Sequence, residues 1–304
     1  MSSDVIPAGS VGLNIDPSAA DAAAAHRLAR LADEGGVDFV GVQDHLYHPE
    51  FLDAWTLIAT LAARTGRLTL MPNVASTVLR APAPLIKAAH SLSILTGGRV
   101  ALGVGAGAAP PATAAYGGPE RTPGQAVTAF EEALRVMRAM NGPGTDDAVR
   151  FDGDYHHLRG ARPGPFADRP VPLLIGAYRP RMLRITGRLG DGWLPSNGFA
   201  PPEAITAMQR EIDAAATDAG RDVREIRRVY NVMGTITDGS APAAEGRRLT
   251  GPPNFWVDTL LRYRADLGFD SFLFWPVDAD PEEQATRFIT DVAPHIRAAP
   301  GHGA

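Results

Sequence analysis

The segment VPLLIGAYRPRMLRITGRLGDGWLP, residues 171–195, decides the fold because it holds one complete repeat of the chain. An apolar run at 171–177 predicts a buried strand, residues 179–188 predict a helix, and DGWLP at 191–195 predicts the next strand. Pro180 suits the first turn of that helix, where an N–H would have no partner within the helix. Two parallel strands need such a crossover between them, so the segment predicts a strand–helix–strand unit.

The same alternation extends over the whole chain. Further apolar runs, which predict strands, lie at 11–15, 37–42, 67–74, 99–105, 226–236 and 269–275. Helices are predicted at 19–34, 53–64, 82–95, 123–140, 202–219, 254–266 and 281–297. The strands are almost continuously apolar, as in parallel sheets that are covered on both faces. Eight such units predict an α/β fold of the (β/α)₈ TIM-barrel type, with a doubly wound open sheet of fewer strands as the alternative.

Three segments interrupt the alternation. Residues 106–122 are rich in Gly, Ala and Pro and predict a loop after the fourth strand, and residues 141–170 contain a possible hairpin around 149–158. Both insertions lie around the fourth helix. A third insertion, at 237–253, follows the seventh strand. None has the composition of a domain linker, so the sequence predicts a single domain over residues 1–304.

Composition excludes several kinds of protein. The net charge of −5 and the pI of 5.9 give no attraction to nucleic acid or anionic membranes. The chain has no cysteine, which excludes disulfides, thiolate metal sites and thiol nucleophiles. No segment approaches the ~18 apolar residues of a membrane span, and the N-terminus lacks the pattern of a secretory signal. We therefore expect a cytoplasmic protein that acts on a small molecule.

Polar residues follow the second predicted strand directly, in the order Gln43, Asp44, His45. In a barrel, the carboxyl ends of the strands line the mouth of the active site. His45 could act there as a general base or bind a cofactor, with the Asp44 carboxylate fixing its tautomer. The alternative is a turn pair with no chemical role. A metal site that also uses His48 has no second group of ligands to support it, so no metal is predicted.

Two further strand ends could hold an anion. The glycines of GVGAG, residues 103–107, would let backbone N–H groups approach a phosphate, although a tight strand-to-loop turn explains them equally well. Arg179 precedes the helix that begins at Pro180, whose free N–H groups also favour an anion. The alternative for Arg179 is an ordinary surface arginine.

Several segments, in this order, resemble the bacterial-luciferase-like superfamily of flavin- and deazaflavin-dependent oxidoreductases. They are QDH (43–45), LIATLAARTGRLTL (57–70), VLRAPAPLIKAAHSLSILTGGRVALGVGAG (78–107), EEALRVMRAM (131–140) and VPLLIGAYRPRMLRITGRLGDGW (171–193). The resemblance covers most of the chain. It implies a TIM barrel that holds FMN or the deazaflavin coenzyme F420 at its mouth.

The resemblance also implies roles for single residues. Asp44 and His45 would lie near the cofactor ring, where the histidine would assist proton or hydride movement and Asp44 would orient it. The Asn73–Val74 bond would match a cis peptide against the ring. Cofactor-binding positions would be Asn73, Val74, Val104, Gly105, Ala106, Gly107, Gly176, Ala177, Tyr178 and Arg179. Sugar-phosphate dehydrogenases of the superfamily have Glu and Trp where this chain has Ala108 and Pro49, which argues against that substrate.

The sequence therefore favours F420-dependent hydride transfer on an uncharged organic substrate. The first alternative is an FMN-dependent monooxygenase that uses O₂ and receives reduced flavin from a separate reductase. The second is a non-catalytic flavin-binding barrel. The resemblance also implies a homodimer.

Overall fold

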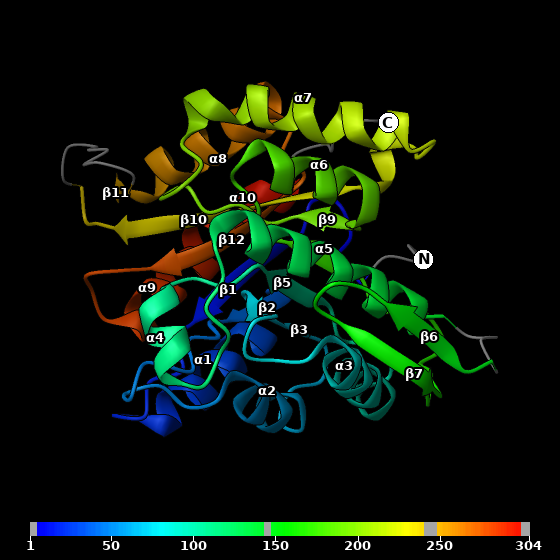
Figure 1. The fold of residues 1–304 in the computed structure, drawn as a ribbon. Coiled ribbons are helices and arrows are strands. Elements are labelled where there is room, and N and C mark those ends of the chain that lie inside the picture. The colour runs from blue at the N-terminus through cyan, green and yellow to red at the C-terminus, as the bar shows by residue number, and fades with distance from the viewer. Residues whose placement is uncertain (1–4, 143–146, 240–247, 299–304) are drawn as a thin grey trace.

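A computed structural model describes residues 5–142, 147–239 and 248–298. Parallel strands form a barrel in these residues, and helices surround it (Figure 1). The strand order is β3-β2-β1-β12-β10-β9-β8-β5-β4. The strands are β1 (Val11–Ile15), β2 (Phe39–Val42), β3 (Thr69–Pro72), β4 (Ala75–Ser76), β5 (Leu102–Gly105), β8 (Leu173–Ile175), β9 (Gly192–Trp193), β10 (Arg227–Ile236) and β12 (Ser271–Pro276).

The strands close into a barrel. β1 pairs in parallel with β12, so the first and last strands along the chain are neighbours. The strand order begins with β3 and ends with β4. β4 pairs with β5, and a parallel bridge joins Leu70 of β3 to Val100 just before β5, which closes the barrel. β3 and β4 together occupy the third strand position, which was predicted as one strand at 67–74. The predicted TIM barrel is confirmed.

Helices follow the strands near the predicted positions. They are α1 (Ala22–Glu34), α2 (Ala54–Ala62), α3 (Pro82–Thr96), α5 (Pro123–Ala139), α6 (Pro180–Leu189), α7 (Pro202–Asp218), α8 (Pro253–Leu267), α9 (Pro281–Arg287) and α10 (Ala293–Ala298). Asp53 caps α2 through the backbone N–H of Thr56, and a capping box at Thr122 starts α5. The last predicted helix is divided, because a π-helical turn at Phe288–Val292 separates α9 from α10.

The insertions are more ordered than predicted. The expectation of a loop throughout 106–122 is wrong, because this segment contains the helix α4 (Pro110–Ala115). Two prolines suit its first turn, since they lack the N–H that a first turn leaves unpaired. The predicted hairpin is confirmed as β6 (Val149–Asp152) and β7 (His157–Ala161). The third insertion contains β11 (Leu249–Gly251), which pairs with β10. The parts of these insertions at 143–146 and 240–247 lie outside the described residues.

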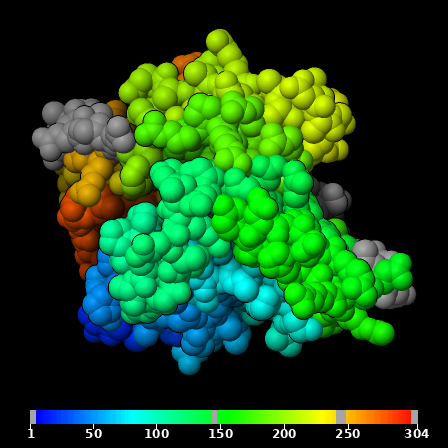
Figure 2. Space-filling model, viewed as in Figure 1, coloured from blue at the N-terminus to red at the C-terminus, as the bar shows by residue number. Residues whose placement is uncertain are grey.

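The insertions lie at opposite ends of the barrel. α4 lies at the same end of the barrel as the carboxyl tips of β10 and β12, whereas the β6–β7 hairpin lies toward the amino ends (Figure 1). In the space-filling view the hairpin projects in bright green at the edge away from α4 (Figure 2). α4 therefore belongs to the end of the barrel where the predicted site lies.

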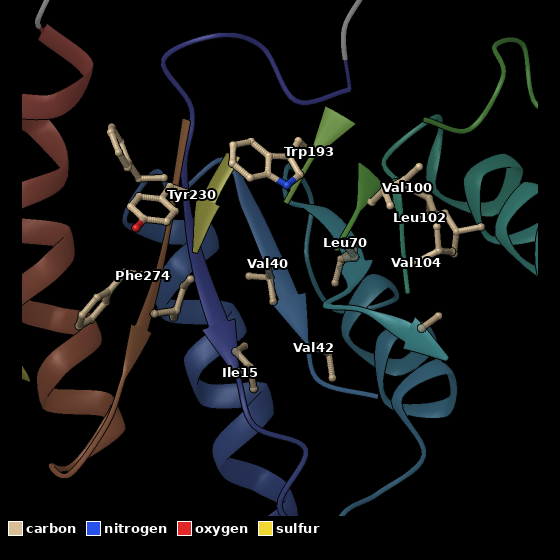
Figure 3. Close-up of a cluster of buried hydrophobic side chains, with 14 of the residues drawn as sticks. Ile15, Val40, Val42, Leu70, Val100, Leu102, Val104, Trp193, Tyr230 and Phe274 are labelled. Carbon is tan, nitrogen blue, oxygen red and sulfur yellow. The ribbon is translucent and has the colours of Figure 1, made fainter. Parts of the chain in front are cut away.

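Barrel strands such as β1, β2, β3, β5 and β8 bury both of their faces, which explains the unbroken apolar runs. One set of side chains, including Val40, Leu70 and Phe274, packs outward against the helices (Figure 3). A smaller set fills the inside of the barrel: Ile6, Phe39, Met71, Ala101, Leu174, Leu194, Val229 and Leu273. Val74 packs on this inner set. The inside of the barrel is therefore a packed core whose upper end lies under the mouth.

Two cavities, of about 430 and 520 Å³, lie at the amino ends of the strands around Val5. None of the predicted site residues lines either of them. Since TIM-barrel enzymes carry their active sites at the carboxyl ends of the strands, these cavities are not the candidate site. Within the part of the chain that the structure describes, no helix is long and apolar enough to cross a membrane.

Candidate active site at the barrel mouth

A buried ion pair fixes the loop that follows β2. Arg80 donates to both carboxylate oxygens of Asp44, from Nε and Nη2, with each N···O distance at 2.7 Å. Nη2 of Arg80 also donates to Asp53 Oδ2 at 2.6 Å. The Asp44 side chain is 1% exposed and that of Arg80 is 19% exposed. A bidentate arginine–carboxylate pair in this setting is a strong and geometrically specific contact.

This pairing corrects the role predicted for Asp44. We expected its carboxylate to orient His45, but both of its oxygens accept hydrogen bonds from Arg80 instead. Asp44 thus holds its loop against Asp53 and the start of α2 by sharing one guanidinium. It acts on His45 through the position of the loop and through its charge, which raises the pKa of His45 slightly against stronger opposing effects.

His45 contacts a tyrosine that the sequence analysis did not single out. Its Nδ1 lies 2.7 Å from the Tyr47 hydroxyl. Burial, followed by the nearby His48, lowers the pKa of His45 below the ordinary value of 6.5. Burial also raises the pKa of Tyr47 above 10. At neutral pH the structure therefore presents an uncharged imidazole beside a protonated phenol.

A second carboxyl group stands at the end of β1. Asp16 accepts a hydrogen bond from Gln43 and a longer one, at 3.3 Å, from Asn14. Asp16 reaches solvent in the mouth, but the surrounding strand ends remove much of its hydration, and this burial raises its pKa. The nearby Trp275 indole lowers the pKa of Asp16 in part, although its N–H makes no hydrogen bond within the described residues. Asp16 is thus a candidate acid at the end of β1, the strand that pairs with β2.

Sequence reasoning missed Asp16, although a signal was present. Asp16 follows the first apolar run directly, just as Gln43 and Asp44 follow the second. The same rule about strand ends would have placed it at the mouth.

A non-proline cis peptide joins Asn73 to Val74, as the resemblance implied. The Asn73 side chain donates to Asn14 Oδ1 at 2.9 Å, which connects the third strand position to the chain of amides around Asp16. The Val74 side chain sits between glycines. A Cβ added to Gly105 would lie 2.9 Å from Val74 Cγ2, and one added to Gly176 would lie 3.3 Å from the same atom.

These glycines make room for Val74, because its side chain occupies the space that a Cβ at position 105 or 176 would need. Gly107 adds a backbone position at φ +91°, which side chains rarely adopt, and a Cβ there would lie 2.7 Å from Val78. The side-chain oxygen of Asn231 is buried in β10 without a partner within the described residues. An apolar side chain packed among glycines and an unpaired buried amide oxygen fit a flat, polar-edged ring of the flavin or deazaflavin type.

The start of α6 lies at the second strand end at which an anion was predicted. Arg179 is the N-cap and Pro180 the first helical residue, as predicted, and no side chain caps this end. The Arg179 side chain is exposed, whereas Arg181 is committed to α5 through Gly124 O and Thr128 Oγ1. The free N–H groups of the first turn together with Arg179 suit a phosphate.

The remaining predicted positions contribute backbone or packing. Val104 is fully buried and packs outward against the helices, and Ala106 lies partly buried against the same core. The Ala177 carbonyl accepts from Trp193 Nε1 at 2.9 Å. The Tyr178 hydroxyl accepts from the Ser196 backbone N–H at 3.3 Å, and its ring centroid lies 5.4 Å from that of Phe199. The bulk of Tyr178 therefore packs the loop after β9.

No three histidine, aspartate or glutamate side chains gather to hold a metal ion within residues 5–142, 147–239 and 248–298. Asp44, the carboxylate that a metal site in the β2 loop would need, is bound to Arg80. The site consists of titratable side chains, amides and exposed backbone.

The family model for luciferase-like monooxygenases matches residues 6–283, which include every strand of the barrel in the described residues. The chain belongs to the luciferase-like monooxygenase family. It is accordingly an oxidoreductase, and the resemblance seen in the sequence is confirmed.

Relatives within this family differ in chemistry. The F420-dependent glucose-6-phosphate dehydrogenase of Gordonia bronchialis is 28% identical over 298 residues, which cover 90% of this chain and 87% of that protein. A solved F420-dependent secondary alcohol dehydrogenase, with an F420–acetone adduct, superimposes with a TM-score of 0.81 at 19% identity, covering 94% and 98% of the two chains. A monooxygenase of Streptomyces bottropensis gives a TM-score of 0.77 at 22% identity, covering 94% and 98%. This luciferase-like chain thus shares its fold with hydride-transfer enzymes and with oxygenases.

Proposed function

We propose that this protein transfers a hydride between F420 and an uncharged organic substrate, with His45 at the reacting centre. The observation that carries the proposal is the pair of titratable groups on neighbouring strand ends. Burial lowers the pKa of His45 after β2 and raises the pKa of Asp16 after β1. Opposite shifts of this kind place a neutral imidazole and a carboxyl group with a raised pKa on neighbouring strand ends, a pattern typical of acid–base sites.

The residues around the mouth fit the cofactor. When bound, F420 supplies a ring carbon that accepts or gives a hydride. Val74 and the backbone at Gly105 and Gly176 would support the ring, and the first turn of α6 with Arg179 would hold the phosphate. His45 would hold or donate a proton at the substrate oxygen, and Asp16 would exchange a proton with the same oxygen. Arg80 keeps the His45 loop in place through Asp44.

An uncharged substrate suits the rim of the mouth. Phe199, 65% exposed, presents an apolar ring there, backed by the ring of Tyr178. Arg80 is paired with Asp44 and Asp53, and Arg248, in the loop after β10, is paired with Asp278. A substrate phosphate that bound to either of these two arginines would have to displace a carboxylate partner. The dehydrogenase of Gordonia bronchialis acts on glucose 6-phosphate by its name, and we propose a different, uncharged substrate for this chain.

The choice of cofactor is tested by titrating F420 and FMN separately while recording tryptophan fluorescence. The chain has four tryptophans, and Trp275, near the end of β12, interacts with Asp16. We expect saturable quenching by F420 with micromolar or tighter affinity. F420 reduction by uncharged secondary alcohols, and none by glucose 6-phosphate, would then support the substrate class. Saturation by FMN alone would favour the monooxygenase alternative, and no response to either would favour a non-catalytic barrel.

Arg179→Ala should weaken F420 binding about 5- to 30-fold, because it removes ~1–2 kcal/mol of contact between a partly solvated guanidinium and the phosphate. Arg181→Ala is the matched control. It removes the same charge from the same helical turn, but Arg181 is bonded to α5. The dissociation constant from the fluorescence titration should change for the first variant and stay near the wild-type value for the second. Equal values for both variants would place the cofactor phosphate elsewhere.

An FMN-dependent monooxygenase is the second candidate function, favoured by the family model and by the shared fold. It would require a separate reductase to supply reduced flavin. We also propose a homodimer for either function. Light scattering of the purified protein measures its mass directly, and a value near 32.1 kDa would contradict the dimer.

A further inference from the structure

We propose that Tyr47 is a positioning residue that keeps His45 in the tautomer with its proton on Nε2, so that His45 works as a neutral N–H donor. The catalytic consequence rests on the proposed function. The tautomer itself is a property of the cofactor-free protein and is tested without turnover.

The contact that carries this inference lies within one short loop. Tyr47 follows His45 by two residues, and its hydroxyl lies 2.7 Å from Nδ1. The two ring centroids are 5.5 Å apart at an angle of 57°, so the rings do not stack and the hydroxyl reaches the edge of the imidazole. A contact of this length is a hydrogen bond, and it needs one donor and one acceptor.

The chemistry of the two groups decides which one donates. Burial keeps the proton on the Tyr47 phenol and disfavours the imidazolium form of His45. A neutral imidazole carries one proton on one of its two nitrogens. Its bare nitrogen is a far better acceptor than a phenol oxygen, and the phenol O–H is the stronger donor. The Tyr47 hydroxyl therefore donates to Nδ1, which leaves the imidazole proton on Nε2.

Two neighbours of His45 are compatible with the same state. Asp44 would compete for a proton on Nδ1 if its carboxylate were available, but Arg80 occupies both of its oxygens. His48 packs edge-on at 5.6 Å between ring centroids and lowers the pKa of His45 further. The orienting role expected of Asp44 thus belongs to Tyr47.

A donor on Nε2 has a definite use at the mouth. A neutral N–H can stabilise negative charge that develops on a substrate oxygen, without a full proton transfer to or from the imidazole. Asp16 then remains as the group that exchanges the proton. This arrangement suits reduction of a carbonyl compound, in which negative charge appears on oxygen as the hydride arrives.

The test uses protein labelled with nitrogen-15 at its eight histidines and free of cofactor. Long-range proton–nitrogen correlation spectra distinguish the two neutral tautomers and the imidazolium. His45→Gln assigns the His45 signals by their loss. His90 is an internal reference, because its Nδ1 accepts from the Ala167 backbone N–H at 3.2 Å, which requires the proton on Nε2. We expect His45 to show the same pattern as His90 at pH 7.

Tyr47→Phe should move the His45 signals toward the average of the two tautomers. It should also raise the pH at the midpoint of the His45 titration by about 0.5–1, because the neutral imidazole loses one hydrogen bond. Tyr116→Phe, at a tyrosine that is 55% exposed, should change neither. A wild-type His45 with its proton on Nδ1, or a Tyr47→Phe spectrum identical to wild type, would overturn the inference. The wild-type spectrum tests the tautomer even if the Tyr47→Phe variant misfolds. A failed F420 titration would contradict the proposed function and not the tautomer.

Discussion

Replacing Arg80 with methionine should lower the free energy of unfolding by about 3–5 kcal/mol, the usual cost of removing one partner from a buried ion pair. Methionine keeps much of the apolar volume, so the loss falls on Asp44, whose side chain is 1% exposed. Its carboxylate would lose two hydrogen bonds and keep a weaker one, at 3.4 Å, from the Ser76 backbone N–H. Urea denaturation followed by circular dichroism measures the difference.

Arg248→Met is the matched control for this prediction. Arg248 pairs with Asp278, but these side chains are 49% and 67% exposed, so the loss should be at most about 1 kcal/mol. Asp44→Asn introduced into the Arg80→Met protein should restore about 1–2 kcal/mol, because an amide is cheaper to bury unpaired than a carboxylate. Equal losses for Arg80→Met and Arg248→Met would show that Asp44 takes up a proton or reaches solvent when its partner is removed.

The barrel could be predicted because its signal is local and repeated. Each strand is an apolar run that buries both faces, and each helix begins at a residue such as Pro180 or Thr122 that suits a first turn. α4 was missed because the composition of 106–122, rich in Gly, Ala and Pro, is typical of loops. The three residues of β11 were missed because a strand that short carries no periodic pattern.

The sequence predicted where the site lies but not which of its side chains bond to one another. Sequence position placed His45 at the mouth, because any residue directly after a barrel strand lies there. The partner of Asp44 lies 36 residues away, and Asp44 has an equally good potential partner in the adjacent histidine. The direction in which the Asp44 side chain leaves the end of β2 decides whether it pairs with Arg80 or with His45. Residues 39, 41 and 43 face the inside of the barrel, whereas Asp44 faces outward to Arg80.

His45→Ala should reduce kcat by about 10²–10⁴-fold while F420 still binds, since it removes the group that donates to the reacting oxygen. The matched control is His48→Ala. His48 lies in the same loop, but its side chain is 45% exposed and 3.5 Å from Glu50, so kcat should fall far less than in His45→Ala. Steady-state kinetics and the F420 fluorescence titration separate loss of chemistry from loss of binding. An unchanged kcat in His45→Ala would leave Asp44 and His45 as a turn without a chemical role.

A third variant separates the two chemical roles open to His45. Glutamine has a side-chain N–H that can donate a hydrogen bond, but it does not accept a proton near neutral pH. If His45 acts as a neutral donor held by Tyr47, His45→Gln should retain at least about tenfold more activity than His45→Ala, since one preorganised donor of this kind is commonly worth that much or more. If His45 acts as a general base, glutamine offers nothing that alanine lacks, and the two variants should be equally slow. The ratio of their kcat values therefore tests the tautomer by a route that is independent of the spectra.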